Sequence, residues 1–505
     1  MDYRSRTTLT SVVLMAIFCF FITACGGGGG GGGDSDVAAR GEVVDINIHG
    51  KIHGEAVGVA VNRNTNAEAA RSSSSWATSN FSDFGLSFAS AGVPYKFYFI
   101  ENNARAFPLY AGAVNVFNLP SADMNGDLGF IDTATGVAVP ENSPLTFSGV
   151  SAGGEDTSIP PSLASVSFSQ ADLVGDWHDF ILTSTDGTAG QQPGWSHSQW
   201  TVDASGNVAQ SSILDSLGNT TSTDFSLETM LSGFLTASNN DTYQGIIALD
   251  RKMLIGLGTL EPTNAAGPYG YCLRTAIKGG GSYATADLSG SWFFFGLVTG
   301  STGAGERPGW YWGKKDIDAA GNISFPISVT DSLGSNFMPP LGTAYSVAAD
   351  GSITATGSAT FHGAMNLDKN LFLVTYTGAP AGPTGVTGYN LQFNIKAGSG
   401  FAVSDLAGTW RVQMLTAGAG GWTGWVRGAM VLDTTGTGIW RSVIRSNGTS
   451  SATSAGGLTL TMAATGLITS PTDPSVHGVM TSDKKLIIAT MTDGAGDANI
   501  MILQK

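Results

Sequence analysis

One six-residue pattern, Asp-Leu-x-Gly-x-Trp, occurs three times in this chain, beginning at Asp172, Asp287 and Asp405. Further shared segments follow each copy in the same order: a Gly-Trp pair, an Asp-x-x-Gly turn, and an Asp that precedes a basic residue. These segments contain Trp195, Trp310 and Trp425, the turns 203–206, 318–321 and 433–436, and Asp250, Asp368 and Asp483. So many shared segments at nearly constant spacing indicate an internal repeat, in which each copy is one structural unit. The sequence therefore predicts three similar domains over residues 166–280, 281–400 and 401–505.

Each repeat has the pattern of a β meander. In the third copy, turn residues separate the segments TWRVQML, WVRGAMVL, GIWRSVI, LTLTMAA, GLITS, SVHGVM, KLIIATM and ANIMILQ. Their alternation of apolar and polar residues places every second side chain on one face, as in β-strands. Antiparallel strands joined by short turns can close on themselves, and closure removes the exposed edges that favour aggregation. We therefore expect about eight strands in each copy, arranged as a barrel.

The Gly-x-Trp at the start of each copy, with Trp177, Trp292 and Trp410, resembles the first strand of lipocalin and avidin barrels. The resemblance implies that each indole closes one end of an eight-stranded antiparallel barrel. A six-bladed propeller is the alternative, because residues 428–433 (GAMVLD) are echoed by residues 478–483 (GVMTSD) within one copy. The Gly-rich joints KGGGSYATA and KAGSGFAVS favour separate barrels connected by linkers.

Residues 41–165 differ from the repeats and predict another β domain. Runs such as VVDINIHG, YKFYFIEN and AVNVFNL alternate like strands, and turn-rich segments separate them. The composition agrees, because Gly accounts for 70 of 505 residues and charged residues for only 12%, and such a mixture favours strands and tight turns. The segment resembles the small β-sandwich modules of many secreted bacterial proteins. The expected fold is therefore all-β, with an N-terminal β-sandwich before the three repeats.

The N-terminus has the pattern of a secretion signal. Arg4 and Arg6 precede an apolar run over residues 12–22, which is shorter than the roughly 20 residues that span a bilayer. The following FITAC, ending at Cys25, resembles the bacterial lipobox. That resemblance implies a signal peptide over residues 1–24 and a lipid-modified Cys25. Because Gly26 rather than Asp follows, it also implies location at the outer membrane, with residues 25–40 as a glycine-rich tether. An ordinary signal peptide or a marginal anchor helix is the alternative.

Charge and cysteine content exclude several functions. Lys and Arg number 24 against 39 for Asp and Glu, so the chain repels phosphate backbones and a nucleic-acid partner is not expected. Besides Cys25, the chain after residue 24 has only Cys272, so no intramolecular disulfide can form, and its alternating surroundings predict a buried, inert thiol. No acidic or histidine cluster recurs in all copies. We therefore expect no catalytic residues, no metal and no cofactor.

Tryptophan is the remaining candidate for a binding side chain. Pairs of tryptophans lie in Gly- and Pro-rich segments of each copy, where aromatic faces suit sugar rings or apolar ligands. The candidates are Trp195, Trp200, Trp310, Trp312, Trp422 and Trp425. Packing in a core is the alternative role for these residues.

The leading hypothesis is a lipid-anchored envelope protein, not an enzyme, with a binding or surface-scaffold role of the adhesin-like or glycan-binding kind. Its partners would be the membrane, through the N-terminal lipid, and a glycan, a small apolar ligand or another envelope protein. A carrier of small apolar ligands in lipocalin-like barrels is the second hypothesis. An enzyme built on a propeller is the third.

Overall fold

The computed structural model describes residues 44–73, 81–90, 92–120, 122–141, 151–185, 193–210, 213–222, 224–260, 270–300, 308–339, 342–378, 388–418 and 422–505, without the side chains of residues 152 and 452–457. The expected signal peptide, Cys25 and the glycine tether lie outside the described residues. Residues 43–505 form one compact unit. Among the residues described, no helix combines the length and the apolar character needed to cross a bilayer.

The N-terminal part is a β-sandwich, as predicted. One sheet has the order β4–β1–β8–β9, with β1 parallel to β8, and the other has the order β10–β7–β5–β2–β3, with β6 paired to β5. Side chains from both sheets, such as Ile46, Phe84 and Phe97, form one apolar core. The strands are β1 (Val44–His53), β2 (Ala56–Asn62), β3 (Glu68–Arg71), β4 (Phe81–Ser90), β5 (Pro94–Glu101), β6 (Arg105–Pro108), β7 (Val116–Asn118), β8 (Met124–Asp132), β9 (Val139–Pro140) and β10 (Ser151–Gly154).

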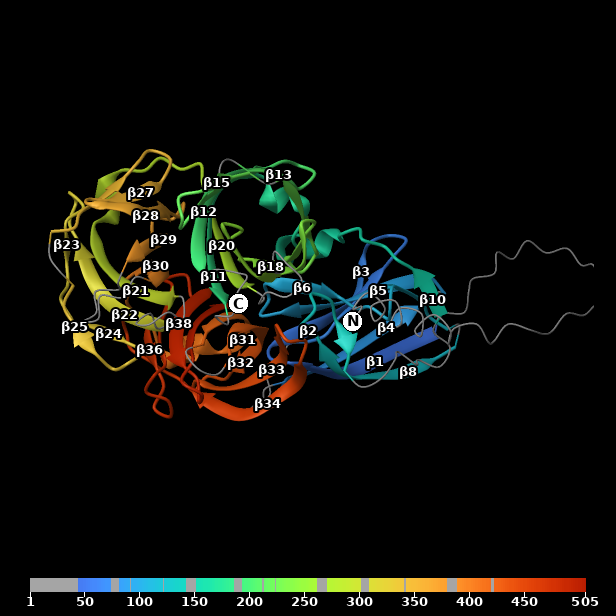
Figure 1. Cartoon of the computed structure of the whole chain (residues 1–505). Coiled ribbons are helices and arrows are strands. Elements are labelled where there is room, and N and C mark those ends of the chain that lie inside the picture. Colours follow the sequence, from blue (N-terminus) through green and yellow to red (C-terminus); the bar gives the residue numbers. More distant parts are fainter. Residues whose placement is uncertain are drawn as a thin grey trace, which may run out of the picture. The chain divides into compact units, whose positions relative to one another are not determined.

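Each repeat is an antiparallel meander that curls into a barrel, shown in green, yellow to orange, and orange to red in Figure 1. In the described part of the first repeat, eight strands close because the first strand pairs with both the second and the last. They are β11 (Gly175–Thr185), β12 (Gly194–Val202), β13 (Asn207–Gln210), β16 (Phe225–Thr229), β17 (Phe234–Ala237), β18 (Asn240–Ile247), β19 (Met253–Leu260) and β20 (Gly270–Lys278). A hairpin of β14 (Ile213–Asp215) and β15 (Thr220–Thr221) branches from β12, and the short 3-10 helices η2 (Pro161–Val166) and η3 (Gln170–Leu173) precede the barrel.

The other two repeats follow the same plan. The second has η4 (Thr285–Leu288), β21 (Gly290–Thr299), β22 (Gly309–Ile317), β23 (Ile323–Ser324), the hairpin β24 (Val329–Asp331) and β25 (Asn336–Phe337), β26 (Tyr345–Val347), β27 (Ser352–Ala355), β28 (Ser358–Met365), β29 (Leu371–Gly378) and β30 (Gly388–Lys396). The third has η5 (Val403–Leu406), β31 (Gly408–Ala417), β32 (Gly424–Leu432), β33 (Thr437–Arg445), β34 (Ser450–Thr459), β35 (Thr461–Met462), β36 (Leu467–Thr469), β37 (His477–Met480), β38 (Leu486–Thr492) and β39 (Ala498–Gln504). Because the main strands of each copy form one continuous sheet, the propeller alternative is wrong.

The Asp-x-x-Gly turns close the barrels. Gly206, Gly321 and Gly436 have φ of +84°, +87° and +81°, a backbone conformation that favours glycine. Each glycine carbonyl accepts a backbone N–H from across the seam, and a Cβ on the glycine would collide with the carbonyl of that same partner. The donors are Leu227, Tyr345 and Leu460, each at 2.9 Å.

The repeated pattern joins a tight turn to a buried indole. Trp177, Trp292 and Trp410 have exposed fractions of 1%, 0% and 0%, which agrees with the expected closing of a barrel end. Each indole N–H donates to the carbonyl of the leucine in its own pattern, and a lysine at the end of the last strand or directly after it lies over each ring. The acceptors are Leu173 (2.8 Å), Leu288 (2.6 Å) and Leu406 (2.6 Å), and the lysines are Lys278, Lys396 and Lys505.

The aspartate of the pattern fastens this turn to another part of the barrel. The Asp172 carboxylate accepts the backbone N–H of Ser169 at 2.8 Å and pairs with Arg251 at 2.8 Å. The other copies repeat both contacts, with Asp287 to Ala284 and Lys369, and Asp405 to Ala402 and Lys484, all at 2.9 Å. Turn, indole and ion pair together explain why the pattern occurs in every copy.

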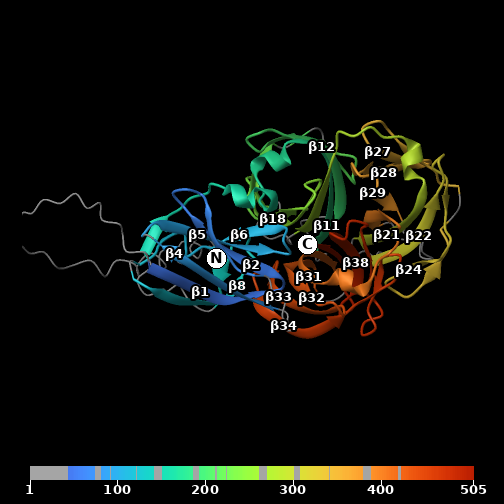
Figure 2. The same cartoon turned by 180° about the vertical axis from the view of Figure 1, so that it is seen from behind.

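In both views the three barrels surround a common centre (Figures 1 and 2), and side chains from all three form one shared apolar core. Outward-facing side chains of all three barrels contribute, including Phe180, Phe295 and Ile488. In each repeat the indole of the Gly-Trp pair donates to a threonine hydroxyl of the next repeat, and the third repeat donates to the first. The bonds join Trp195 to Thr377 (2.8 Å), Trp310 to Thr492 (2.7 Å) and Trp425 to Thr259 (2.9 Å). Each copy forms its own barrel, as expected, but the expected independence of the barrels is wrong, because they bury one another's outer surfaces.

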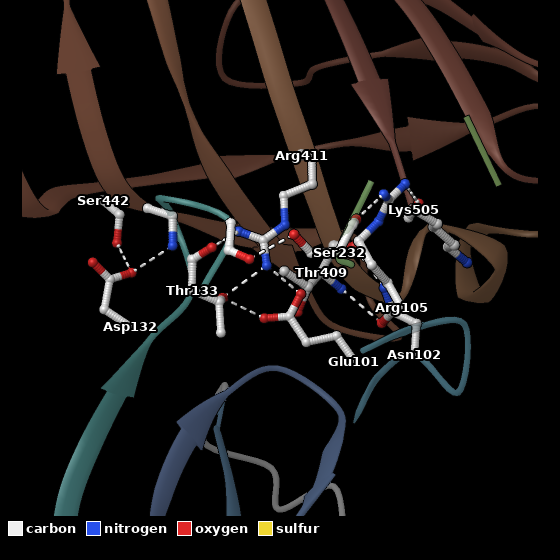
Figure 3. Close-up of polar contacts among 12 residues, drawn as sticks. Glu101, Asn102, Arg105, Asp132, Thr133, Ser232, Thr409, Arg411, Ser442 and Lys505 are labelled. Atoms are coloured by element: carbon white, nitrogen blue, oxygen red, sulfur yellow. Dashed lines mark hydrogen bonds and ion pairs between the residues drawn. The ribbon is translucent and has the colours of Figure 1, made fainter. Parts of the chain in front are cut away.

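The sandwich contacts the ring of barrels through buried charges (Figure 3). Arg411 of β31 forms an ion pair with Glu101 and donates to the Thr133 hydroxyl at 2.7 Å. Arg105 donates to the carbonyl oxygen of Ser232 in the first barrel at 2.5 Å. The exposed fractions of Glu101, Arg105 and Arg411 are only 3%, 2% and 4%. The sandwich is therefore held against both the first and the third barrel.

Candidate ligand site in the second barrel

The six tryptophans proposed for ligand binding do not form an exposed surface. Trp195, Trp310 and Trp425 lie in strands β12, β22 and β32 and are buried in the shared core, so their predicted loop position is wrong. The last strands of the neighbouring repeat lie against them, with contacts of β12 to β29 and β30, of β22 to β38 and β39, and of β32 to β19 and β20. A binding role for these three residues stays a prediction, with no open ring face in this arrangement.

The other candidates occupy different environments. Trp200 is buried in the first barrel, with its ring 4.9 Å from the Arg274 guanidinium. Trp312 is partly buried and stacks on His477 with 4.7 Å between ring centroids. Trp422 precedes β32, and its backbone N–H donates to Asp497 at 2.7 Å. The expected loop position is thus met only by Trp422, and the structure does not bring the six side chains into one site.

The three barrels differ at an interior position next to the buried tryptophan of the repeated pattern. It lies on the second strand of each barrel and pairs with this tryptophan on the first strand, which we call the closing tryptophan. It is Trp200 opposite Trp177, Lys315 opposite Trp292, and Met430 opposite Trp410. A bulky aromatic, a cation and a flexible thioether fill the same volume differently, so this position determines what space each barrel retains.

The first barrel is filled by a paired cation. Arg274 forms an ion pair with Asp179, with Nε 2.9 Å from Oδ1, and its guanidinium lies between the rings of Trp200 and Phe225 at 4.9 and 4.7 Å. The exposed side-chain fractions of Arg274 and Asp179 are 11% and 2%. Cys272 on the same strand β20 is buried, as predicted, and burial raises the pKa of its thiol to about 11.

The third barrel is filled by methionine. Met430 and its neighbours pack with aliphatic side chains in a continuous core below Trp410. Methionine fits irregular volumes because it is unbranched and has three rotatable bonds. The methionines of this core are Met414, Met430, Met462, Met480, Met491 and Met501.

The second barrel instead contains a cavity of about 300 Å³. Thr356 and Gly357, which are exposed, lie at its rim. Its wall is mainly aromatic, with a few polar groups, which is typical of a small-molecule site. The aromatic lining residues are Phe294, Tyr311, Phe325, Phe337, Tyr345, Phe361 and Tyr376, and the polar ones include Lys315 and Gln392.

Lys315 is the cation of this cavity. Its exposed fraction is 2%, and its ammonium donates to the Tyr345 hydroxyl at 3.1 Å. The rings of Tyr345, Phe372 and Phe294 lie 4.8, 5.1 and 5.2 Å from Nζ. Within the described parts of the chain, no carboxylate forms an ion pair with Lys315, and burial lowers the pKa of this amine well below its usual value.

A chain of hydrogen bonds follows the cavity wall. Tyr311 donates to Gln392 Oε1 at 3.0 Å, so the hydroxyl of Tyr376, 2.9 Å away, donates to Tyr311. Gln392 in turn donates to Asn394 at 2.6 Å. Burial raises the pKa of Tyr376 to about 12, so this phenol is neutral at physiological pH. Gly296 leaves room for this network, because a Cβ there would collide with the ring of Tyr311.

Another hollow of about 510 Å³ lies between the first and second barrels. It is bordered by Asp176, Asp350 and the glycines 279–281, whereas Trp177 and Trp200 at its edge are buried in the first barrel. Across the described ranges, no group of three or more His, Cys, Asp or Glu side chains could hold a metal ion. The aromatic cavity of the second barrel is therefore the better candidate for a ligand site.

Sequence reasoning missed this site for a specific reason. Sequence analysis did not single out Lys315, because two adjacent lysines are typical of an exposed segment, whereas the strand alternation of β22 places Lys315 inside. The useful signal was a comparison of the three copies, in which only the second has a charge opposite its closing tryptophan.

No protein-family model and no curated protein matches the chain. Solved structures that are similar to it include the following three. A DUF3598-family protein of unknown function from Nostoc punctiforme has 12% identity and a TM-score of 0.18, over 45% of this chain and 97% of that one. Transferrin binding protein B from serogroup B Neisseria meningitidis has 8% identity and a TM-score of 0.20, over 65% and 75%. A double mutant of transferrin binding protein B from Haemophilus parasuis has 9% identity and a TM-score of 0.19, over 88% and 85%. Scores this low carry no inference about fold or function.

Proposed function

We propose that the chain is a non-enzymatic, lipid-anchored envelope protein whose second barrel binds a small, largely apolar ligand. The observation that carries this proposal is the cavity of about 300 Å³ in the second barrel, at a place where the described residues of the first barrel include Trp200 beside Arg274 and those of the third barrel include a methionine-rich apolar cluster. Close packing is the normal state of a protein interior, so a retained aromatic cavity indicates an occupant. The anchoring part of the proposal depends on the lipobox-like sequence that ends at Cys25.

Titration with N-phenyl-1-naphthylamine, a neutral aromatic probe that fluoresces in apolar surroundings, tests the ligand site. We expect saturable binding to the wild-type chain at one site. Ala355→Trp, which places an indole in the cavity, should weaken binding at least tenfold. Thr354→Trp is the matched control, because Thr354 is the exposed neighbour on the same strand. Unsaturable binding to the wild type, or equal binding to the Ala355→Trp variant, would contradict the proposal.

Surface binding to another envelope protein is a second candidate. Leu217 and Leu333, at equivalent hairpin tips of the first and second barrels, have exposed fractions of 68% and 69%. Asp215 and Asp331 hold both tips by accepting two backbone N–H groups each. A double Leu→Ser variant should lose a cross-linked envelope partner and keep probe binding. Cross-linking identical to that of the wild type would contradict this candidate.

A further inference from the structure

We infer that the ligand of the second barrel carries an acidic group that pairs with Lys315. This inference depends on the proposed ligand site and adds the chemical class of its ligand. A buried charge is costly unless a counter-charge or several hydrogen bonds replace its water. Lys315 has one described hydrogen bond, to a neutral phenol.

Other deeply buried cations among the described residues have partners that Lys315 lacks. Arg105, exposed to 2%, forms no ion pair within the described part of the chain but donates to the backbone carbonyls of Ser232, Ile247 and Lys505. Lys96, exposed to 1%, lies 3.2 Å from an Asp156 oxygen and also donates to Ser158. Arg411, exposed to 4%, pairs with Glu101. Lys315 is as deeply buried as these groups, but its surroundings provide aromatic rings in place of a carboxylate.

Arg274 in the first barrel provides the closest internal comparison. It occupies the interior of the same fold, also lies between aromatic rings, and has Asp179 as its counter-charge within the barrel. At the place of Asp179, two residues after the closing tryptophan, the second barrel has Phe294. The second barrel thus retains a cation and an open volume, and the matching anion is absent from its described lining. An acidic ligand would supply both the missing charge and the missing atoms.

The aromatic environment favours such a ligand over a neutral one. Three ring faces within 5.2 Å stabilise a positive charge on Nζ, so the amine is prepared to accept a proton when an anion arrives. The Tyr345 hydroxyl, bonded to the same Nζ, holds the amine in place. The apolar remainder of the ligand would contact Phe325, Phe337 and Phe361. An amphipathic monoanion, such as an aromatic or aliphatic carboxylate, fits this description.

Two probes that differ by a single sulfonate test this inference. 8-Anilinonaphthalene-1-sulfonate is N-phenyl-1-naphthylamine with one added anionic group. We expect the wild-type chain to bind the sulfonate at least tenfold more tightly than the neutral probe. Lys315→Met should reverse this preference, because it leaves an apolar cavity and reproduces the residue that the third barrel has at this position. Lys314→Met, on the opposite face of the same strand, should keep the wild-type preference.

The outcomes separate this inference from the proposed function. If neither probe binds saturably, both the ligand site and its charge preference are wrong. If the wild type binds both probes with equal affinity, the cavity is a ligand site and the inference about charge is wrong. The wild-type comparison alone decides this point, even if the Lys315→Met variant does not fold. A preference that persists in Lys315→Met would also overturn the inference, because the sulfonate would then be recognised elsewhere.

Discussion

The buried contact between the sandwich and the third barrel allows a sharp test of the architecture. Glu101 accepts hydrogen bonds from Arg411 and from the Thr133 hydroxyl, the latter at 2.5 Å. Glu101→Gln keeps the size of the side chain and removes its charge. The Arg411 guanidinium then remains buried, with Arg105 as a second cation nearby and no counter-charge in this contact.

The expected loss of stability is large. Removing one partner of a buried ion pair typically costs about 3–5 kcal/mol, because the other charge remains unpaired away from water. The total free energy of unfolding of a domain is about 5–15 kcal/mol, so this loss should detach the sandwich well before the barrels unfold. Arg411→Met in the Glu101→Gln background removes the unpaired charge and should recover most of the loss.

Urea denaturation at pH 7, followed by tryptophan fluorescence and circular dichroism, measures this effect. The matched control is Glu68→Gln, which breaks the exposed pair with Arg71 (side-chain exposed fractions 27% and 39%) and should change stability by less than about 1 kcal/mol. A loss below about 1 kcal/mol for Glu101→Gln, equal to that of the control, would refute a desolvated ion pair at this contact.

Three more predictions follow from the ring, from the buried histidines and from the N-terminus. The excised third repeat, residues 401–505, should associate or unfold, because it exposes its part of the shared apolar core. A fragment that is monomeric in ultracentrifugation and melts cooperatively would contradict this. Burial lowers the pKa of His53 to about 4 and of His197 to about 3, so below pH 6.5 the unfolded chain binds protons that the folded chain does not. The free energy of unfolding should therefore fall between pH 6.5 and 4, by up to about 1.4 kcal/mol per pH unit for each histidine. His197→Phe should reduce this slope in denaturation measured at several pH values. Cys25→Ser should release the protein from the membrane fraction, and retention equal to that of the wild type would contradict the lipobox assignment.

The sequence predicted the path of each repeat well. Each of the eight segments expected in the third copy overlaps a strand of its barrel, and the closing tryptophans are buried as expected, but the prediction missed most of β34, of which only the last two residues fall in an expected segment. These features depend on local patterns, namely alternation, turn residues and one repeated motif, which act within a single copy.

The packing of the barrels on one another could not be predicted in the same way, although a signal was present. Strand β21 reads SWFFFGLV, and its side chains are buried on both faces. Continuous apolar strands indicate burial on both faces, as in a sheet covered from two sides. A barrel in water would alternate instead. The identity of the covering partner, however, depends on contacts such as Trp310 to Thr492, which join residues far apart in the sequence.

The ring of barrels also explains where function can diverge. Outward-facing side chains must fit a neighbouring repeat, so the indole-to-threonine contact is the same in all three copies. Interior side chains contact only their own barrel, and here the copies differ as Trp200, Lys315 and Met430. The interior of one barrel has thus diverged to an aromatic cavity with a buried lysine, whereas the described interiors of the other two contain a paired arginine and a methionine-rich cluster. This arrangement lets the other two barrels stabilise a neighbour whose interior is not optimised for stability.

A final prediction follows from this division of roles. Lys315 lowers the stability of the second barrel because folding removes its amine from water without supplying a counter-charge, which is also why burial lowers the pKa of this amine, so Lys315→Met should raise the melting temperature of the chain measured without ligand. An acidic ligand should stabilise the wild type by about 2.7 kcal/mol at a hundredfold excess over its dissociation constant, and Lys315→Met should lose most of this gain. Differential scanning calorimetry with and without 8-anilinonaphthalene-1-sulfonate measures both effects. If Lys315→Met melts at a lower temperature than the wild type without ligand, Lys315 stabilises the barrel by packing. The proposal that Lys315 destabilises the barrel in order to bind an acidic ligand would then be wrong.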